Sequence, residues 1–314
     1  MSSFLSSLYR LQRGPSKSFT ERLFKLFARP IINIVLSSDP DPTVEVNLGK
    51  RKLWMNWSHN LPSFLSAYPN YETEIGRLAN FIYRKSGHLM MIDVGANVGD
   101  TVATLPEFSK ARFLCIEGSP KYFDILARNF GENPQVQCVK ALLSDDAEEL
   151  SGHSLIERGG TAHLGADGSP SGGVVSETLD ALLTRYSSFE SANLLKIDTD
   201  GFDFRVLKGG GKLLSRSRPA VHFELSFRLW RQVGKTDITE ALRWLSLAGY
   251  HSGILYDNLG FLIDTDSFEA STKLTTLHEY SLRRHDFYLN VIAFHEESNW
   301  AAEFLASERK HKFQ

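Results

Sequence analysis

The sequence predicts an α/β protein in which helices cover both faces of a mostly parallel, doubly wound sheet. Two apolar runs carry this prediction. The first, 89–94, lacks helical spacing and leads into Gly95 and Gly99, which is the pattern of a buried strand, a tight turn and a helix start. The second, 112–116, ends in Glu117 and is followed by a helical pattern over 121–130. Strands that alternate with helices in this way are typical of parallel sheets.

The turn after the first strand favours a nucleoside ligand without a diphosphate. Gly95 and Gly99 are four positions apart, and Asn97 stands where the dinucleotide fingerprint needs a glycine for the pyrophosphate to reach the backbone. Glu117, at the tip of the neighbouring strand, can accept both hydroxyls of a ribose. S-adenosylmethionine fits these features. Its ammonium needs a carboxylate such as Asp93, and its carboxylate needs free backbone amides.

Three further blocks, 194–203, 204–210 and 219–225, complete a resemblance. Together with 93–100 and 117–120 they resemble the signature blocks of the FkbM family of S-adenosylmethionine-dependent methyltransferases, over roughly residues 71–294. The resemblance implies a class I, Rossmann-like fold with a seven-stranded sheet. It also implies O-methylation of a hydroxyl on a glycan, glycolipid or secondary metabolite. The family generally carries Glu where Asp200 and Asp203 stand, so these shorter acids depart from its pattern.

The cofactor site is expected at the ends of the first four strands. Related enzymes usually contact adenine at the end of the third strand, here at Ala141 and Leu142. The expected cofactor-binding residues are Asp93, Gly95, Ala96, Asn97, Gly99, Asp100, Thr101, Glu117, Gly118, Ser119, Ala141, Leu142 and Asp198.

Catalytic candidates alternate at the ends of the fourth and fifth strands. Lys196, Asp198 and Asp200 share one side if the fourth strand stays extended, and His222 and Glu224 form a second set. Asp198 is the first choice for contact with the cofactor amine or the acceptor, Lys196 for holding its charge, and His222 for a general base. A structural ion pair and a hydrogen-bonded core histidine are the alternatives. These carboxylates also suit Mg²⁺, but Lys196 among them disfavours a metal.

Charge and cysteine content narrow the classes of partner. Residues 1–30 carry six basic residues and one acid, Glu21, so they are net positive while the remainder is net negative. A negative main body argues against a nucleic-acid groove.

Cys115 and Cys138 fall in predicted strands, which indicates free thiols in a reducing compartment. No apolar run approaches the ~20 residues of a membrane span. A cytoplasmic protein is expected, with possible peripheral contact to the inner face of the membrane through residues 1–30.

Ahead of the core, the sequence predicts an extension over residues 1–67. It consists of helices over 2–13 and 18–28, a strand over 31–36 and a β-hairpin over 44–57 that turns at 48–50. Trp54, Trp57 and His59 either line an acceptor site or cover a sheet edge. The methyltransferase domain is expected over 68–297, beginning with a helix over 68–85, and a charged tail helix over 298–314.

Other segments complete the predicted domain. A third strand is expected over 136–143, a helix over 238–249, and a closing antiparallel pair from 252–263 and 287–294. Six glycines in 159–173 predict a mobile loop, with His153 and His163 beside or within it. Whether this loop is a lid over the acceptor or a plain linker is open.

Two other function classes compete with methyl transfer. An NAD-dependent oxidoreductase is disfavoured by Asn97. A non-catalytic scaffold would keep the fold and use the basic N-terminal helices to recruit a membrane or a partner. The alternative for these helices is packing on the chain's own domain or on a second subunit of a homodimer.

Overall fold

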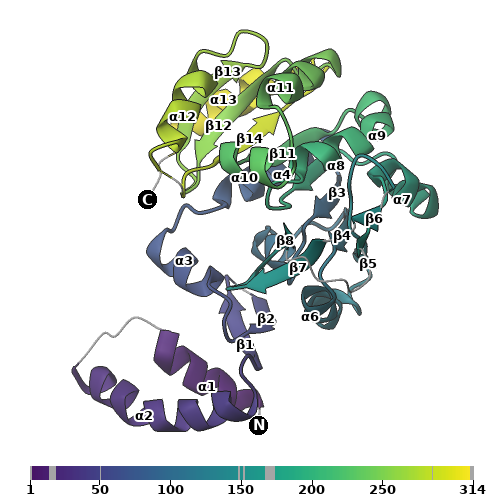
Figure 1. Ribbon diagram of the computed structural model, residues 1–314. Helices are drawn as coiled ribbons and strands as arrows, with labels where there is room; N and C mark the ends of the chain where they lie inside the picture. Colours follow the sequence, from purple (N-terminus) through teal and green to yellow (C-terminus); the bar gives the residue numbers. More distant parts are fainter. Residues whose placement is uncertain are drawn as a thin grey trace.

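The computed structural model describes residues 2–13, 19–49, 51–147, 149–150, 153–166, 174–284 and 286–311. Its centre is an eight-stranded sheet with the order β13-β12-β14-β11-β10-β3-β4-β5 (Figure 1). The strands are β3 (Leu89–Val94), β4 (Ala111–Glu117), β5 (Val136–Lys140), β10 (Leu194–Ile197), β11 (Ala220–Leu225), β12 (Ser252–Asp257), β13 (Leu262–Ser267) and β14 (Leu289–Ala293).

The pairing pattern confirms the predicted α/β class. β11, β10, β3, β4 and β5 run parallel to one another, and β14, β12 and β13 extend the sheet with antiparallel pairs. The resemblance implied seven strands, and the eighth is β13. The predicted antiparallel segment 252–263 is in fact the start of a hairpin, because the turn at 258–261 lets β13 pair with β12.

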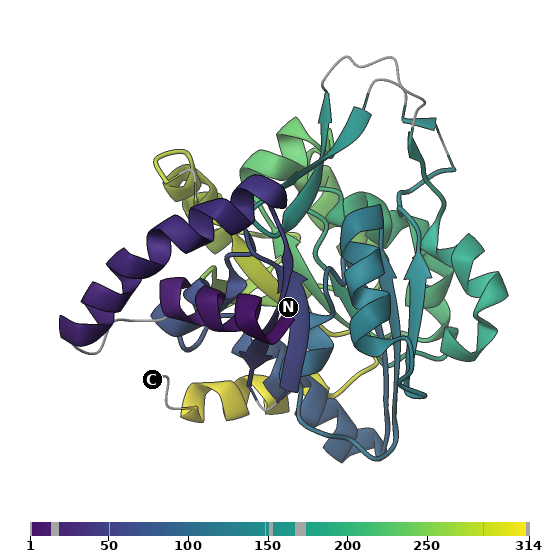
Figure 2. The same cartoon turned by 90° about the horizontal axis from the view of Figure 1, so that it is seen from below.

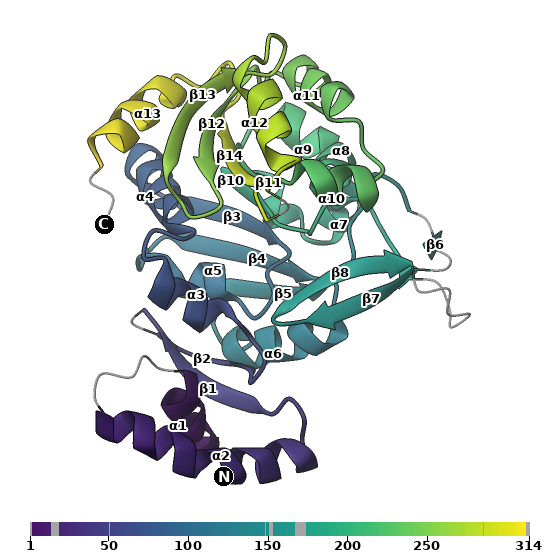
Figure 3. The same ribbon diagram turned by 60° about the vertical axis from the view of Figure 1, so that its left-hand side comes forward.

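Helices cover both faces of the sheet (Figures 1 and 3). One face packs against α4 (Thr73–Ser86), α5 (Asp100–Thr104), α6 (Pro120–Phe130) and α13 (Trp300–Lys310). The other packs against α7 (Leu179–Arg185), η1 (Ser187–Phe189), α8 (Asp203–Gly209), α9 (Gly211–Arg216), α10 (Phe227–Gln232), α11 (Ile238–Leu247) and α12 (Lys273–Ser281). Side chains alternate along each strand, so Met91 and Leu194 belong to the first core and Ile92 and Leu195 to the second.

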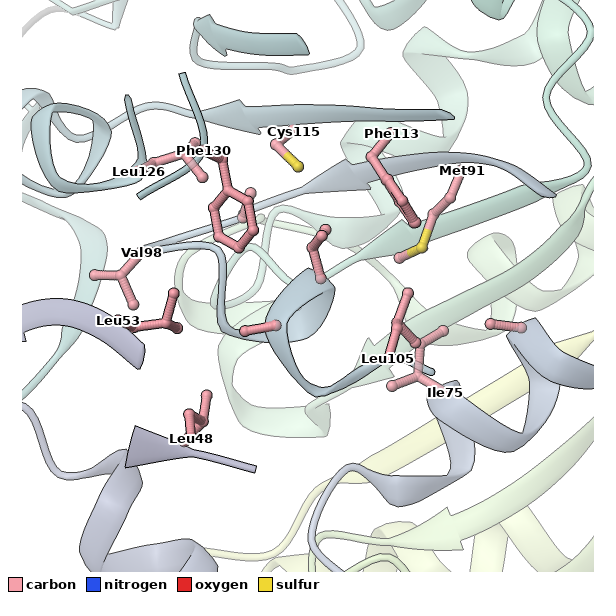
Figure 4. Close-up of a cluster of buried hydrophobic side chains, with 14 of the residues drawn as sticks. Leu48, Leu53, Ile75, Met91, Val98, Leu105, Phe113, Cys115, Leu126 and Phe130 are labelled. Atoms are coloured by element: carbon pink, nitrogen blue, oxygen red, sulfur yellow. The ribbon is translucent and has the colours of Figure 1, made fainter. Parts of the chain in front are cut away.

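The N-terminal extension consists of two helices and a hairpin. α1 (Ser2–Arg13) packs on α2 (Phe19–Ser38) and on β1 (Thr43–Leu48), which pairs with β2 (Arg51–Asn56) (Figures 1 and 2). Leu53 of β2 lies beside Val98, which joins the hairpin to the main core (Figure 4). The predicted strand over 31–36 is wrong. Ala28 and Ile32 are both buried one helical turn apart, so packing keeps this β-branched run helical beyond Pro30.

The outer side of α2 is apolar. Phe27, Ile31 and Ile34 are 75%, 45% and 68% exposed, and their spacing places them along one stripe of the helix. Membrane contact through this region stays a prediction. Among the described residues, no helix has both the length and the hydropathy needed to cross a bilayer.

The glycine-rich segment is only partly a loop. Residues 153–166 form a second hairpin from β7 (His153–Arg158) and β8 (Thr161–Ala166), which turns at Gly159 and Gly160. A mobile loop over the whole of 159–173 is therefore wrong for 161–166, and residues 167–173 lie outside the described part. His153 and His163, which were expected beside or within this loop, belong to β7 and β8. Two short strands, β6 (Glu149–Leu150) and β9 (Val174–Val175), pair beside this hairpin.

The tail helix α13 is anchored in the protein. Phe304 is buried, and the Glu308 carboxylate accepts hydrogen bonds from Arg77 of α4 and from the Tyr256 hydroxyl of β12. These contacts hold α13 on the first face of the sheet.

Candidate functional site

Charged side chains form a row across three neighbouring strands. Asp93 of β3 is in register with Lys196 of β10, and Lys196 with His222 of β11, so all three lie on the same face. Lys196 Nζ lies 3.4 Å from Asp93 Oδ1 and 3.3 Å from Asp198 Oδ2. Burial raises the pKa of Asp93. Although burial opposes it, the carboxylates of Asp93 and Asp198 hold the pKa of Lys196 well above its usual value. Lys196 is therefore a fixed cation at this end of the sheet.

The turn between β3 and α5 depends on its glycines. Gly95 has φ +78°, and a Cβ there would lie 1.8 Å from the Asp198 carbonyl oxygen. Gly99 has φ +87°, and a Cβ there would overlap the Phe130 ring. Only glycine permits this approach of the β3 and β10 ends. The turn is thus fixed against the neighbouring strand.

The backbone amides of this turn already have partners. Gly95 and Ala96 donate to the Ile116 carbonyl at 2.9 and 3.0 Å, and Asn97 N–H donates to Glu117 Oε2 at 2.8 Å. These three amides are therefore not free for a cofactor carboxylate. Strand β4 ends beside the turn, and its Ile116 carbonyl and Glu117 carboxylate accept the hydrogen bonds from these amides.

Glu117 is held with its carboxylate toward the turn. Its second oxygen accepts a hydrogen bond from Ser119 N–H at 2.7 Å. Burial raises the pKa of Glu117 to about 7, although the hydrogen bonds from the Ser119 and Asn97 N–H groups favour the ionised form and oppose this shift. Each oxygen keeps a further lone pair for a ribose hydroxyl. The orientation is the one that the ribose-binding interpretation requires.

A cavity of about 570 Å³ opens at the carboxyl ends of these strands. Twelve residues predicted from sequence line it: Gly95, Asn97, Asp100, Glu117, Gly118, Ser119, Ala141, Leu142, Lys196, Asp198, Asp200 and Glu224. Ligands of open α/β sheets bind at this edge. The structure thus brings most of the predicted cofactor and catalytic residues to one place.

Five predicted residues do not line this cavity: Asp93, Ala96, Gly99, Thr101 and His222. Asp93 is fully buried and pairs with Lys196. Gly99 and Thr101 lie at the start of α5, where Thr101 is buried and Gly99 packs against Phe130. His222 is 2% exposed, and its Nε2 lies 3.3 Å from Glu74 Oε1, which also accepts a hydrogen bond from Asn290 at 2.7 Å. The structure gives His222 a buried polar partner rather than access to a substrate.

Several acids in or beside the cavity have raised pKa values. Burial raises the pKa of Asp100 to about 6, of Asp200 to about 7 and of Asp203 to about 8, and it raises that of Glu224 well above the usual value. Asp200 has φ +50° and faces the cavity, whereas Asp203 is buried and accepts a hydrogen bond from Gly201 N–H. The two acids that depart from the family pattern thus have different surroundings.

Sequence reasoning missed the wall opposite the sheet. This wall comes from α3 (Leu61–Ala67), from the segment between α3 and α4 and from the loop before β14. It includes Phe64, Tyr68, Tyr71, Glu72, Phe287 and Tyr288. The Tyr71 and Tyr288 hydroxyls lie 3.4 Å apart although 217 positions separate them. No local motif marks these residues, and only the run of aromatic residues over 64–71 hints at a site.

His59 and the β7–β8 turn close one side of the cavity. Asn97 Oδ1 lies 3.4 Å from His59 Nε2, and Asn97 Nδ2 donates to the Gly160 carbonyl. Burial lowers the pKa of His59 to about 4, so its imidazole is neutral. Of the hairpin aromatic residues, only His59 lines the cavity; Trp54 lies under Arg128 and Trp57 against Tyr9. The turn between β7 and β8 therefore covers part of the cavity.

Within the described ranges, no group of three or more His, Cys, Asp or Glu side chains has the arrangement of a metal site.

Comparison with known proteins identifies the family. The model of the methyltransferase FkbM domain matches residues 93–252. Similar solved structures include precorrin-6y C5,15-methyltransferase from Geobacter metallireducens GS-15, with 12% identity over 71% of this chain and 87% of that one (TM-score 0.36). They also include the FkbM methyltransferase of Methylobacillus flagellatus KT, with 15% identity over 62% of this chain and 54% of that one (TM-score 0.35). An O-methyltransferase from Bacillus cereus, in complex with SAH, has 15% identity over 74% and 86% (TM-score 0.37).

Among curated proteins, none matches this sequence. The match to the FkbM domain, however, runs from Asp93 to Ser252 and takes in the turn, Glu117 and the ends of β10 and β11. Because that match spans just over half of the sequence, the chain belongs to the FkbM family of methyltransferases.

Proposed function

We propose that this protein is an S-adenosylmethionine-dependent O-methyltransferase that acts on a hydroxyl of a glycan, glycolipid or secondary metabolite. One observation carries the proposal. A single cavity joins Glu117, oriented toward the β3 turn, to a wall of aromatic and carboxylate side chains that faces it. A donor and an acceptor can therefore occupy one enclosed space.

The donor half fits a nucleoside with a cationic tail. Glu117 would accept the ribose hydroxyls, and Ala141, Leu142 and Phe202 line the part of the cavity suited to a flat base. Asp198 and Asp100 would face the amino-acid end, with Lys196 between the carboxylates. A bound S-adenosylmethionine supplies a methyl group already activated by its sulfonium.

The acceptor half suits a ring with hydroxyl groups. The Phe64 ring lies 5.7 Å from that of Tyr68 and 5.6 Å from that of Tyr71, so the three form a continuous aromatic surface at the mouth. Aromatic faces pack against the apolar faces of sugar rings, and carboxylates accept hydrogen bonds from hydroxyls. Both kinds of group are present on this wall.

The chain's main catalytic task is orientation. An in-line displacement needs the acceptor oxygen close to the methyl carbon and on the side opposite the sulfur. Glu224, at the end of β11, lines the cavity and forms no hydrogen bond through its carboxylate with the described residues. A raised pKa makes the ionised form of Glu224 a stronger base than an exposed Glu carboxylate. We therefore assign to this form the proton that the acceptor hydroxyl loses as its oxygen bonds to the methyl carbon and the bond from that carbon to sulfur breaks. Lys196 keeps Asp198 in place beside Glu224.

Calorimetric titration with S-adenosylmethionine, and separately with NADH, tests the donor. Saturable binding of the first, lost in Glu117→Ala, is expected. Binding of NADH alone would replace the proposal with an oxidoreductase. Incubating cell-extract glycans and lipids with methyl-labelled S-adenosylmethionine then tests the reaction. We expect Glu224→Gln to bind the donor normally and transfer no label, whereas an exposed Glu190→Gln control transfers label as the wild type does. Label in the Glu224→Gln reaction would remove Glu224 from the mechanism.

A further inference from the structure

Glu72 occupies an unusual position in the cavity wall. It precedes α4 as its N-cap residue with φ 53° and ψ 21°, in the left-handed region. Its side chain makes no capping hydrogen bond. It lines the cavity instead, and its carboxylate forms no hydrogen bond with any described residue. A capping hydrogen bond therefore does not explain the acid at this helix start.

The backbone at Glu72 is strained for an L-amino acid. Left-handed φ values are rare for residues other than Gly, Asn and Asp, and the strain persists where the surrounding structure imposes it, often at functional sites. Glycine would adopt this conformation without strain. A glutamate here points to a use for its side chain.

The charges around Glu72 show what would complete the site. The charged groups that act on it most strongly are Asp198, Lys196, Asp100 and Glu74, and Glu224 also interacts with it. Burial and the neighbouring acids raise the pKa of Glu72 to about 8. Lys196 is the one cation of this group, and it already pairs with Asp93 and Asp198. Glu72 thus lies among acids, and Lys196 is the one cation among the four charged groups that act on it most strongly.

We infer that Glu72 is a further donor-binding residue, which accepts hydrogen bonds from the ammonium group at the amino-acid end of S-adenosylmethionine. The inference rests on the proposed function. An ammonium carries three N–H donors for a carboxylate that has none, whereas the sulfonium has no donor. The assignment places Glu72 beside Asp198 and Asp100, which line the same end of the cavity.

Titration of the full chain with S-adenosylmethionine and with S-adenosylhomocysteine tests this assignment, because both ligands carry the ammonium and only the first carries the sulfonium. At pH 8.5 we expect Glu72→Gln to weaken both by about 10-fold, the usual effect of losing a hydrogen bond to a charged group. Unchanged affinity, or weakening of S-adenosylmethionine alone, would overturn it. If the wild type binds neither ligand, the proposed function itself fails, which is a distinguishable result.

The number of protons released on ligand binding is a second test, because substitution of a purely structural residue would not change it. Bringing an ammonium to a carboxylate with a raised pKa lowers that pKa, so binding at pH 7 should release protons. Calorimetry in two buffers of different ionisation enthalpy measures this number. We expect it to fall in Glu72→Gln. Because Asp100, whose pKa burial also raises, remains in that variant, part of the release should persist. An identical number in both proteins would contradict the assignment.

Two glycine variants distinguish the effect of backbone strain on stability from the effect of the side chain on ligand binding. Glu72→Gly should melt no lower than the wild type yet bind as weakly as Glu72→Gln. Lys235 is the matched control, since it has φ 51° but lies outside this cavity. Lys235→Gly should also keep its Tm, and it should bind both ligands as the wild type does. Full affinity in Glu72→Gly would show that the side chain is dispensable.

Discussion

The Glu117 carboxylate accepts a hydrogen bond from the backbone N–H of Asn97 at 2.8 Å, and this contact joins the end of β4 to the turn after β3. In Glu117→Gln, the amide nitrogen would face one of two backbone N–H donors. We expect donor affinity to fall by about 10-fold or more. Calorimetry measures the affinity, and an unchanged melting curve would show that the loss is local.

The pKa of Glu117 also predicts a pH dependence. Its carboxyl has a pKa of about 7 in the folded protein, above that of an unfolded Glu. The folded state therefore binds the extra proton, and this group's contribution to the free energy of unfolding falls as the pH rises from about 4.5 to about 7. Ribose binding needs the ionised form, so donor affinity should rise between pH 6 and 8. Glu72 and Asp100 remain in Glu117→Gln, so that variant should keep a shallower rise; a wild-type profile no steeper than that of Glu117→Gln would contradict this.

Gly95→Ala should destabilise the protein by about 3 kcal/mol or more, because it adds backbone overlap with Asp198 to an unfavourable φ. Gly87 is the control. It has φ +75°, and a Cβ added there would meet no atom within 4 Å, so Gly87→Ala should cost only about 1 kcal/mol. Urea unfolding measures both. Equal losses would mean that the turn relaxes and that its close approach to β10 is not required.

Glu308→Ala should cost about 3 kcal/mol, since it leaves Arg77 and the Tyr256 hydroxyl without their buried partner. Glu303, in the same helix, pairs with Lys85 on the surface, so Glu303→Ala should cost less than about 1 kcal/mol. Thermal unfolding compares the two. A small loss in Glu308→Ala would show that α13 is not anchored through this carboxylate.

Gly160→Ala should speed donor release. Gly160 has φ +103°, and a Cβ there would lie 2.7 Å from the His59 ring, so the β7–β8 turn must shift away from the cavity. We expect the dissociation rate, measured by stopped flow, to rise about 3-fold or more. Gly49→Ala, in the open turn of the β1–β2 hairpin, is the control and should leave this rate unchanged. An unchanged rate in Gly160→Ala would make the turn a linker rather than a cover.

The sheet, and the residues that meet at the carboxyl ends of its strands, could be predicted from the sequence because both depend on local pattern. Apolar runs that end in an acid or a glycine place β3, β4 and β10, and the parallel register then brings Glu117 and Asp198 to one edge. The helix over 31–36 was missed because β-branched residues favour strands, while burial of Ala28 and Ile32 decides otherwise.

The acceptor half could not be read in the same way. Tyr71 and Tyr288 meet only in the folded chain, and Glu72 is conspicuous only once its backbone conformation is known. His222 misled for the opposite reason. Its place near a strand end suggests exposure to the cavity, but α4 brings Glu74 over it. Contacts between segments distant in sequence determine which polar residues of a strand end remain accessible.

His59 belongs to the segment that precedes the methyltransferase motifs, yet its ring contacts Asn97, and its carbonyl accepts a hydrogen bond from the Tyr9 hydroxyl of α1. A shortened chain that starts at Tyr68, where the motifs alone would set the boundary, would lack this support together with Phe64. Such a fragment would lack part of the cavity wall, so we expect ligand binding in this cavity to depend on the amino-terminal extension.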